Sequence, residues 1–284
     1  MLHTRSALLL GYGYVAKATA PLLQAAGFQV VGTSRSIEKL DDMRALGVES
    51  LIDPATGDLR EAMALASHIL VSVPPGETGD PMLEALGGDV DLSGLDWLGY
   101  LSTTGVYGDA EGDWVTEETS PAPIALRSKQ RLEAERTWQK LSDMTRVFRV
   151  SGIYGPNRSA LDRVQAGTAR RIVKPGQVFS RIHVDDIAAA LMASIARPDV
   201  TGPFNLADDA PASQAEVTAF AAGLLGVDPP PLEVFETAEM SAMTRSFFSS
   251  SRRVSSAASQ KALGWALKYP DYRAGLQAIY DASI

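Results

Sequence analysis

The 284-residue sequence contains no cysteine and only three histidines. The lack of cysteine excludes disulfide frameworks, thiol nucleophiles and cysteine metal ligands, and it suits a reducing compartment such as the cytoplasm. The histidines, His3, His68 and His183, do not have the spacing of a metal-binding motif. We therefore expect a cytoplasmic protein with no metal site.

Long apolar runs and strongly basic segments are lacking as well. No apolar stretch approaches the ~18 residues of a membrane-spanning helix, and the N-terminal segment has the pattern of a first strand rather than of a targeting signal. The net charge of −8 opposes binding to nucleic acid or anionic lipid, and Arg252-Arg253 is too short a basic patch to overcome it. We expect neither nucleic acid nor membrane as a partner.

Apolar segments of strand length alternate with longer amphipathic segments over the first two thirds of the chain. This alternation is typical of a mostly parallel α/β sheet with helices on both faces. The expected strands span residues 7–10, 28–32, 68–73, 97–102, 146–150 and 176–184, and an aspartate caps the helix that follows the last of them. After about residue 200 the elements become shorter, which indicates a smaller appended region.

A glycine-rich turn, residues 11–16, separates the first expected strand from a helix. Gly11 permits a tight turn, Gly13 lets a pyrophosphate approach the backbone, and Ala16 allows the helix to pack closely on the strand. The segment predicts a Rossmann-type, doubly wound sheet and a dinucleotide site. Its expected contacts are Gly11, Tyr12, Gly13, Tyr14, Val15 and Ala16. A glycine turn in an α/β protein that binds no nucleotide is the alternative.

The second expected strand leads into Ser34 and Arg35. An acidic residue at this point would bind the ribose hydroxyls of NAD(H) and repel a 2′-phosphate. A hydroxyl and a guanidinium suit a phosphate instead, so the sequence favours NADP(H) over NAD(H). Alternatively, Arg35 is a solvated surface residue.

These patterns divide the chain into two regions. We expect an NAD(P)-binding Rossmann domain at residues 1–160, with residues 176–200 returning to the same sheet. Residues 201–284 together with 161–175 are expected to form a smaller α/β region that binds substrate.

Three later segments carry a resemblance to a known family: Tyr100-Leu-Ser-Thr-Thr-Gly-Val-Tyr-Gly-Asp109, Arg149-Val-Ser-Gly-Ile-Tyr-Gly-Pro156 and Arg181-Ile-His-Val-Asp-Asp-Ile187. With the glycine turn before them, they resemble the extended short-chain dehydrogenase/reductases, the NAD-dependent epimerase/dehydratase family. The resemblance covers nearly the whole chain, and its C-terminal part includes the Leu263-Gly-Trp265 ending of a helix.

The resemblance implies a catalytic hydroxyl at Thr103 and a ribose-binding lysine at Lys129. In the family a tyrosine stands four residues before that lysine and transfers a proton, but this sequence has Ala125 there. An alanine methyl cannot act as a general acid or base. The chain therefore resembles an atypical branch that lacks the active-site tyrosine, and Lys129 either holds the ribose or is a solvated helix residue beside Glu133.

Tyr107 and Tyr154 are the nearest substitutes for the missing tyrosine by motif position, although packing or substrate contact explains either residue equally well. Arg181 is a candidate for binding an anionic substrate, with a salt bridge to Asp186 as the alternative. His183 is expected to be structural. Val73, Pro74 and Pro75 should form a rigid wall beside the nicotinamide half of the cofactor.

Two functions of different class follow. One is an NADP(H)-dependent oxidoreductase or epimerase acting on a small carbonyl or hydroxyl compound, with an unconventional proton donor. The other is a dinucleotide-binding sensor or regulatory module that has lost catalysis. A stripe of Ala134, Trp138 and Leu141 suits either a homodimer contact or the protein's own core.

Overall fold

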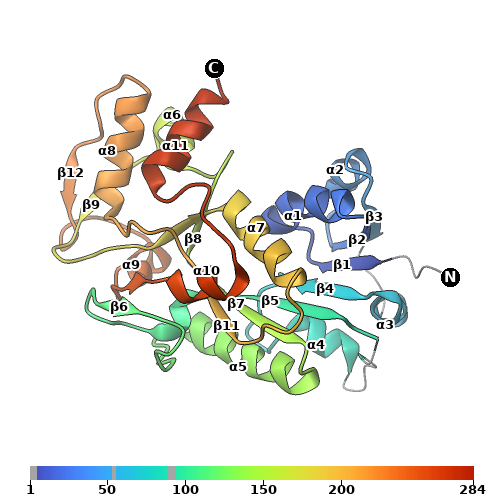
Figure 1. Ribbon diagram of the computed structural model, residues 1–284. Coiled ribbons are helices and arrows are strands. Elements are labelled where there is room, and N and C mark those ends of the chain that lie inside the picture. The colour runs from blue at the N-terminus through green and yellow to red at the C-terminus, as the bar shows by residue number, and fades with distance from the viewer. Residues whose placement is uncertain (1–4, 53–55, 88–91, 93) are drawn as a thin grey trace.

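A seven-stranded parallel sheet forms the centre of the molecule (Figure 1). The computed structural model describes residues 5–52, 56–87, 92 and 94–284. The strand order is β11-β7-β5-β4-β1-β2-β3. These strands are β1 (Ser6–Leu10), β2 (Gln29–Ser34), β3 (Glu49–Ile52), β4 (His68–Val71), β5 (Trp97–Thr103), β7 (Thr145–Val150) and β11 (Pro203–Leu206).

Helices cover both faces of this sheet, and alternate residues of each strand supply the two cores. Ala7 and Leu9 of β1 pack with α1 and α7, whereas Leu8 and Leu10 pack with α3, α4 and α5. The helices of the first face are α1 (Tyr14–Ala25), α7 (Val184–Ile195) and α10 (Ala257–Leu263), and those of the second are α3 (Thr56–Leu65), α4 (Pro81–Leu86) and α5 (Leu126–Leu141). Helix α2 (Lys39–Ala45) lies beside β3.

The chain reverses its direction of winding between β1 and β4, which are neighbours in the sheet. Ligands of open α/β sheets bind in the crevice outside the carboxyl ends of the strands at such a point. The turn after β1 and the ends of β4, β5 and β7 all meet at this edge.

Short elements beyond this edge form a smaller lobe, seen at the upper left of Figure 1. Its core is apolar and includes Leu161, Val217 and Leu276. The remaining elements are η1 (Thr104–Tyr107), β6 (Trp114–Val115), β8 (Gly152–Tyr154), α6 (Ala160–Gln165), β9 (Arg171–Val173), β10 (Arg181–His183), α8 (Gln214–Leu224), β12 (Leu232–Val234), α9 (Ala242–Phe247), β13 (Arg253–Val254) and α11 (Tyr272–Asp281).

The expected fold class is confirmed, and the structure corrects two details. The long strand expected at residues 176–184 is only β10, because the preceding residues form a loop whose backbone bonds cross to other segments, as in Phe179 N–H to the carbonyl of Ala212, 3.1 Å. The cap of α7 is His183 rather than an aspartate: its Nδ1 accepts the backbone N–H of Asp185 at 3.2 Å. His183 is buried, and this role is structural.

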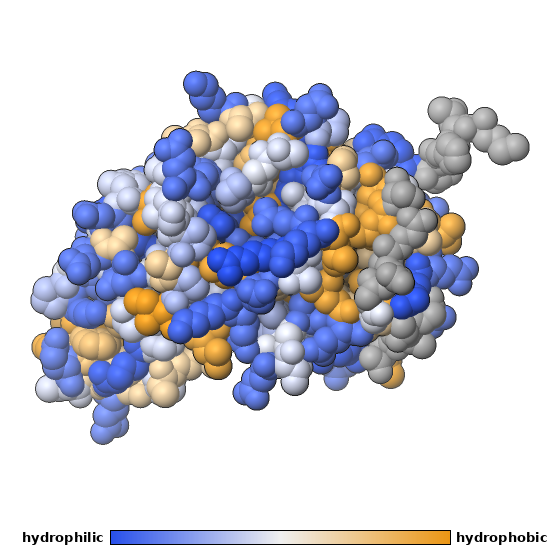
Figure 2. All heavy atoms as spheres, turned by 90° about the horizontal axis from the view of Figure 1, so that it is seen from below, coloured by the Kyte–Doolittle hydropathy of each residue, from blue (hydrophilic) through white to orange (hydrophobic). Residues whose placement is uncertain are grey.

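Helix α5 turns its apolar stripe inward. Ala134 and Trp138 are buried in the core beneath the sheet, and the indole of Trp138 donates to Asp80 at 2.9 Å. Hydrophilic side chains cover much of the outer face seen from below, where α5 lies (Figure 2). Packing within the protein therefore accounts for most of the stripe, and only Leu141 is exposed. Across the described residues, no helix combines the length and apolarity needed to cross a membrane.

Candidate active site

The glycine turn holds the start of α1 open toward the crevice. Gly11 has φ +90°, a backbone conformation that favours glycine, and its N–H donates to the hydroxyl of Thr33 at 2.9 Å. A Cβ at Gly11 would lie 2.8 Å from Val73. The turn is therefore packed tightly against β2 and the end of β4.

Gly13 is the N-cap of α1, and nothing lies within 4 Å of where its Cβ would be. Gly13 has no side chain to cap this twelve-residue helix, so the backbone N–H groups of its first turn face the open space. An open space against uncapped amides at a helix N-terminus is what a pyrophosphate requires. The residues at the turn fit a dinucleotide.

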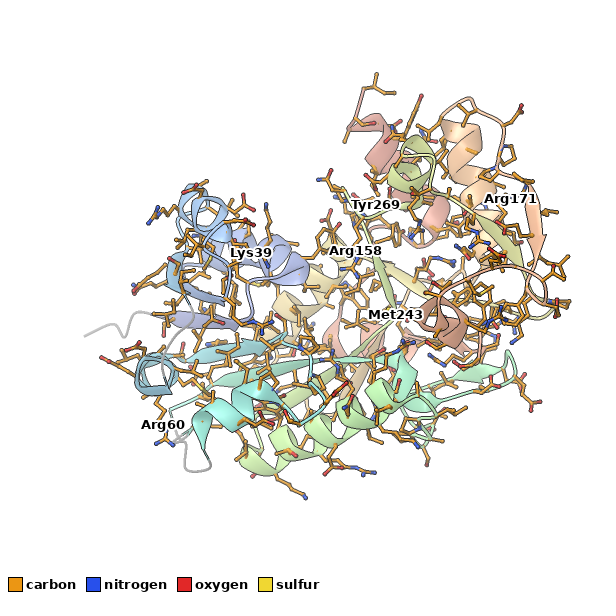
Figure 3. All side chains as sticks on the ribbon, turned by 180° about the vertical axis from the view of Figure 1, so that it is seen from behind. Lys39, Arg60, Arg158, Arg171, Met243 and Tyr269 are labelled. Atoms are coloured by element: carbon orange, nitrogen blue, oxygen red, sulfur yellow. The ribbon has the colours of Figure 1, made fainter. Side chains whose placement is uncertain are left out.

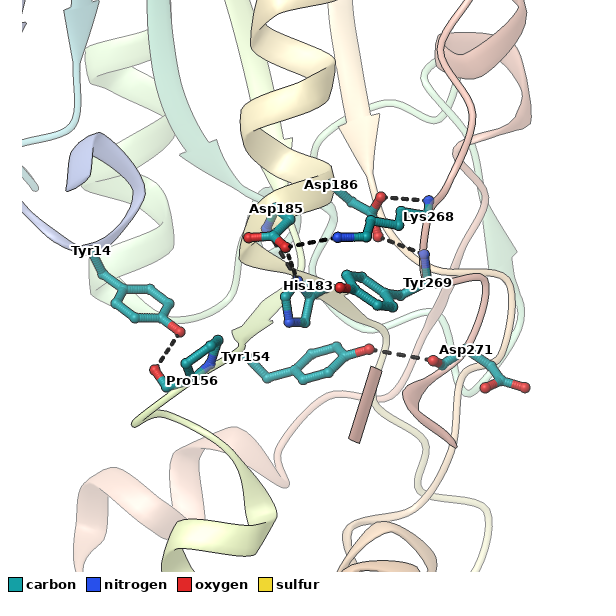
Figure 4. Close-up of polar contacts among 9 residues, drawn as sticks. All are labelled: Tyr14, Tyr154, Pro156, His183, Asp185, Asp186, Lys268, Tyr269 and Asp271. Carbon is teal, nitrogen blue, oxygen red and sulfur yellow. Dashed lines mark hydrogen bonds and ion pairs between the residues drawn. The ribbon is translucent and has the colours of Figure 1, made fainter. Parts of the chain in front are cut away.

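The other residues expected at this turn have different places. Tyr12 is buried in the core, with its ring against Gly32. Val15 and Ala16 are buried where α1 meets the sheet. Tyr14 donates to the carbonyl of Pro156 at 2.9 Å (Figure 4), which links α1 to the loop after β8. Burial raises the pKa of the Tyr14 phenol to about 12, so it stays protonated.

The end of β2 places Ser34 and Arg35 at the rim of the crevice. The hydroxyl of Ser34 accepts the N–H of Ser36 at 3.0 Å and closes a turn, whereas Arg35 is exposed. Lys39, which begins α2, is also exposed (Figure 3). After β4, Val73, Pro74 and Pro75 form a loop that is half-buried to exposed.

A cavity of about 690 Å³ lies at the carboxyl ends of β5 and β7, and the smaller lobe forms its other side. Thr103, the last residue of β5, lines it. The Thr103 hydroxyl accepts the N–H of Gly105 at 3.1 Å and caps η1. Among the described residues it donates to no acceptor, so its proton is available to a bound ligand.

The start of α5 contributes Ala125, Arg127, Ser128 and Arg131 to the cavity lining. Ala125 is the N-cap and has an extended backbone, so it precedes the helix and is not on a helical face. Lys129 is exposed and outside the lining. Arg131 lines the cavity instead, and its guanidinium donates to the carbonyl of Leu101 at 2.9 Å.

The helical phase explains this difference between Lys129 and Arg131. Two residues along an α-helix rotate a side chain by about 200°, so these two side chains point in nearly opposite directions. Glu133 pairs with Arg136 at 3.6 Å rather than with Lys129. Arg127 and Arg131 are thus the two cationic residues that lie four positions apart on α5 and line the cavity.

The hydroxyl groups of the two candidate tyrosines are hydrogen-bonded within the protein. Tyr107 is buried outside the cavity lining, donating to Asn205 at 2.7 Å and accepting from Arg149 at 3.2 Å. Tyr154 lines the cavity and donates to the carbonyl of Asp271 at 3.3 Å (Figure 4). Burial raises the pKa of both phenols, which makes either a poor proton donor at neutral pH.

A buried ion pair supports the cavity wall from behind. Arg149 on β7 and Glu135 on α5 approach at 2.9 Å, and Ser102, which lines the cavity, donates to the same carboxylate. Burial alone would lower the pKa of Arg149, but the hydrogen bonds and charge of Glu135 raise it. The sequence did not reveal this pair, because Arg149 occurred inside a motif and Glu135 in an ordinary helix.

Arg181 lines the cavity, and no carboxylate of the described residues lies within salt-bridge distance of it. Its guanidinium donates to the carbonyls of Phe179 and Ala212 at 2.8 and 2.9 Å. Asp186 accepts the backbone N–H groups of Lys268 and Tyr269 instead (Figure 4). The alternative of an Arg181–Asp186 salt bridge is therefore wrong.

Comparisons with known proteins agree with a dinucleotide-binding fold. Residues 6–90 match the family described as NADP oxidoreductase coenzyme F420-dependent. The chain is 41% identical to a functionally unknown conserved protein from Silicibacter pomeroyi, whose solved structure superimposes with a TM-score of 0.90 over 99% of both chains.

More distant similarities extend over most of the chain. Protein YeeZ of Escherichia coli strain K12 is 26% identical over 238 residues, which are 78% of this chain and 84% of YeeZ. The crystal structure of the human epimerase family protein SDR39U1 with NADPH is 18% identical, with a TM-score of 0.77 over 97% of this chain and 99% of that one. That likeness shows a shared fold.

Proposed function

We propose that this chain is an NADP(H)-dependent oxidoreductase or epimerase acting on a small anionic carbonyl or hydroxyl compound. By its fold and sequence motifs, the chain belongs to the extended short-chain dehydrogenase/reductase superfamily. The observation that supports it best is the hydroxyl of Thr103, which has a proton to donate and lies in an arginine-lined cavity at the same sheet edge as the glycine turn.

Different residues of the chain would bind the cofactor and the substrate. The amides at the start of α1 would hold the pyrophosphate, and Thr103 would donate a hydrogen bond to the substrate oxygen. Arg181 would bind an anionic group of the substrate. A nicotinamide dinucleotide supplies hydride-transfer chemistry when bound. Because both candidate phenols are hydrogen-bonded within the protein, the proton that is transferred in the reaction is expected to come from solvent or from the substrate itself.

The preference for NADP(H) rests on Arg35. Arg35→Ala is expected to reduce the affinity for NADPH by about ten- to hundredfold, the effect of losing a charge-assisted contact of roughly 1.5–3 kcal/mol, and to leave NADH binding nearly unchanged. Titrations with both cofactors measure this. Arg44→Ala is the matched control, since Arg44 is an exposed arginine paired with Asp41 on α2. Equal affinities of the wild type for the two cofactors would contradict the preference.

Catalysis is tested at Thr103. NADPH oxidation would be followed with a panel of aldehydes, ketones and keto acids. Thr103→Val is expected to lower turnover by roughly three- to tenfold or more, because a neutral hydrogen bond to the reacting oxygen contributes about 0.5–1.5 kcal/mol. Thr103→Ser keeps both the hydroxyl and the cap of η1 and should retain activity. Turnover that is equal in the valine and serine variants would remove Thr103 from the mechanism.

The second candidate, a catalytically silent sensor of the dinucleotide, is favoured by Ala125, which cannot transfer a proton, and by the phenols of Tyr107 and Tyr154, which the protein already holds. It predicts tight binding of NADPH together with no oxidation of NADPH by any compound of the panel. The panel thus separates the two candidates.

A further inference from the structure

The cavity carries a strong positive charge within an acidic protein. Thirty-four acidic residues outnumber 26 basic ones over the whole chain. Yet the described lining of the cavity includes no aspartate, glutamate, lysine or histidine. Its charged residues are all arginines: Arg127, Arg131, Arg158, Arg163, Arg181 and Arg252.

None of these six arginines has a carboxylate within 4.0 Å among the described residues. Four arginines elsewhere in the described chain, Arg44, Arg136, Arg149 and Arg170, pair with a carboxylate, and the others do not. Five of the six cavity arginines, all except Arg163, contact an aromatic ring or a backbone carbonyl instead. The guanidinium of Arg158, for example, lies 5.4 Å from the ring centre of Tyr14, at the mouth of the crevice (Figure 3). Within the described part of the chain, no direct ion pair therefore neutralises these guanidinium groups.

One pair of these cations lies where α5 begins. Arg252 donates to the carbonyl of Gly108 and to the hydroxyl of Ser250. Burial lowers the pKa of Arg252, the charge of Asp109 partly opposes this shift, and the charge of Arg127 adds to it. The guanidinium of Arg127 lies 4.1 Å from the ring centre of Phe247, which also lines the cavity. Arg127 and Arg252 thus line the same cavity together with Phe247 and Ser250.

A second pair lies on the smaller lobe. Burial lowers the pKa of Arg181 to about 10, and the nearby charge of Arg163 on α6 adds to this effect. Asp208 is a nearby carboxyl, but burial raises its pKa to about 8. The charge of Asp208 raises the pKa of Arg181, but burial favours the neutral form of Asp208 and weakens this effect.

Holding like charges together in a partly buried cavity costs stability, and a bound anion offsets this cost. The planar guanidinium fork binds two oxygens of a carboxylate or phosphate at once. The two pairs are on different elements, and Thr103 lines the same cavity. We propose that the substrate is a dianion, with one carboxylate or phosphate bound by Arg127 and Arg252 and the other by Arg163 and Arg181. This inference rests on the proposed function and specifies its substrate class.

Binding of defined probes tests the inference without requiring turnover. Calorimetric titrations would compare three probes that carry two anionic groups, succinate, glutarate and 3-phosphoglycerate, with the monoanion butyrate, both with and without NADP⁺. The wild type is expected to bind at least one dianion about tenfold or more tightly than butyrate. The dicarboxylate and phosphate arms show which anionic group the cavity prefers.

Two variants locate the sites. Arg181→Gln and Arg252→Gln should each reduce the affinity for that dianion by about tenfold or more, the usual effect of losing a charged hydrogen bond. Arg181→Lys and Arg252→Lys keep the charge and should retain part of the affinity, which separates loss of binding from loss of fold. Arg136→Gln, on the outer face of α5, is the matched control and should bind as the wild type does.

Equal affinity for dianions and butyrate, or unchanged dianion binding in both glutamine variants, would overturn the inference. Its failure can be told apart from failure of the proposed function. Turnover of monoanionic keto acids without dianion binding would refute only the dianion site. Tight dianion binding without NADPH oxidation would uphold the site and refute the enzyme.

Discussion

Replacement of Gly13 by valine is expected to reduce dinucleotide affinity by more than about a hundredfold, or roughly 2.7 kcal/mol. The space in front of Gly13 is open, and it adjoins the uncapped amides of α1. A valine side chain would fill the place where a pyrophosphate must approach those amides. Because Gly13 has φ −99°, any residue can adopt its backbone conformation, so the fold should persist.

Fluorescence titration with NADPH measures this effect, and thermal unfolding checks the fold. Gly223→Val is the matched control: Gly223 also has open space around its Cβ position, but it lies on α8 in the smaller lobe. The control should bind NADPH as the wild type does. Normal NADPH binding by a folded Gly13→Val protein would show that the phosphates bind elsewhere.

Replacement of Glu135 by leucine is expected to lower the free energy of unfolding by about 3–5 kcal/mol. Glu135 and Arg149 are both buried, and the substitution leaves the guanidinium of Arg149 without its counter-charge. It also removes the acceptor of the Ser102 hydroxyl. Urea unfolding followed by circular dichroism measures the loss.

Two further variants separate charge burial from helix effects. Glu133→Leu changes an exposed residue of the same helix and should alter the free energy of unfolding by no more than about 0.5 kcal/mol. Adding Arg149→Met to Glu135→Leu removes the unpaired charge and should recover much of the loss. A loss below about 1 kcal/mol for Glu135→Leu alone would mean that solvent reaches Arg149.

The sheet was predictable because its central strands are buried on both faces. Every residue of β4 and β7 is buried. Strand β4 contains the apolar run Ile69-Leu-Val71, and β7 contains the apolar residues Val147 and Phe148 between its two arginines and Val150 after them. Strand β3 has no such signal: it lies at the edge of the sheet and is only half-buried, and it begins with an exposed glutamate. The strands of the smaller lobe are two or three residues long, too short for a period to be visible.

The glycine turn was predictable for a different reason, since its residue types are dictated by backbone geometry over a few neighbouring positions. The cavity was not. Its arginines are spread from Arg127 to Arg252 along the chain and converge only through tertiary packing. The sequence also did not show which face of α5 points inward. Two of its inward-facing residues, Ser128 and Glu135, are polar and interrupt the apolar period.

The strand order also has a consequence for biosynthesis. Five neighbouring strands, β5-β4-β1-β2-β3, come from residues 6–103, and β7 and β11 are then added in chain order at one edge. A ribosome releases the chain in the same direction. The strands that flank the glycine turn can therefore pair while the rest of the chain is still being synthesised. The cavity, which includes Tyr272 and Leu276 of α11 in its lining, closes only after α11 has left the ribosome.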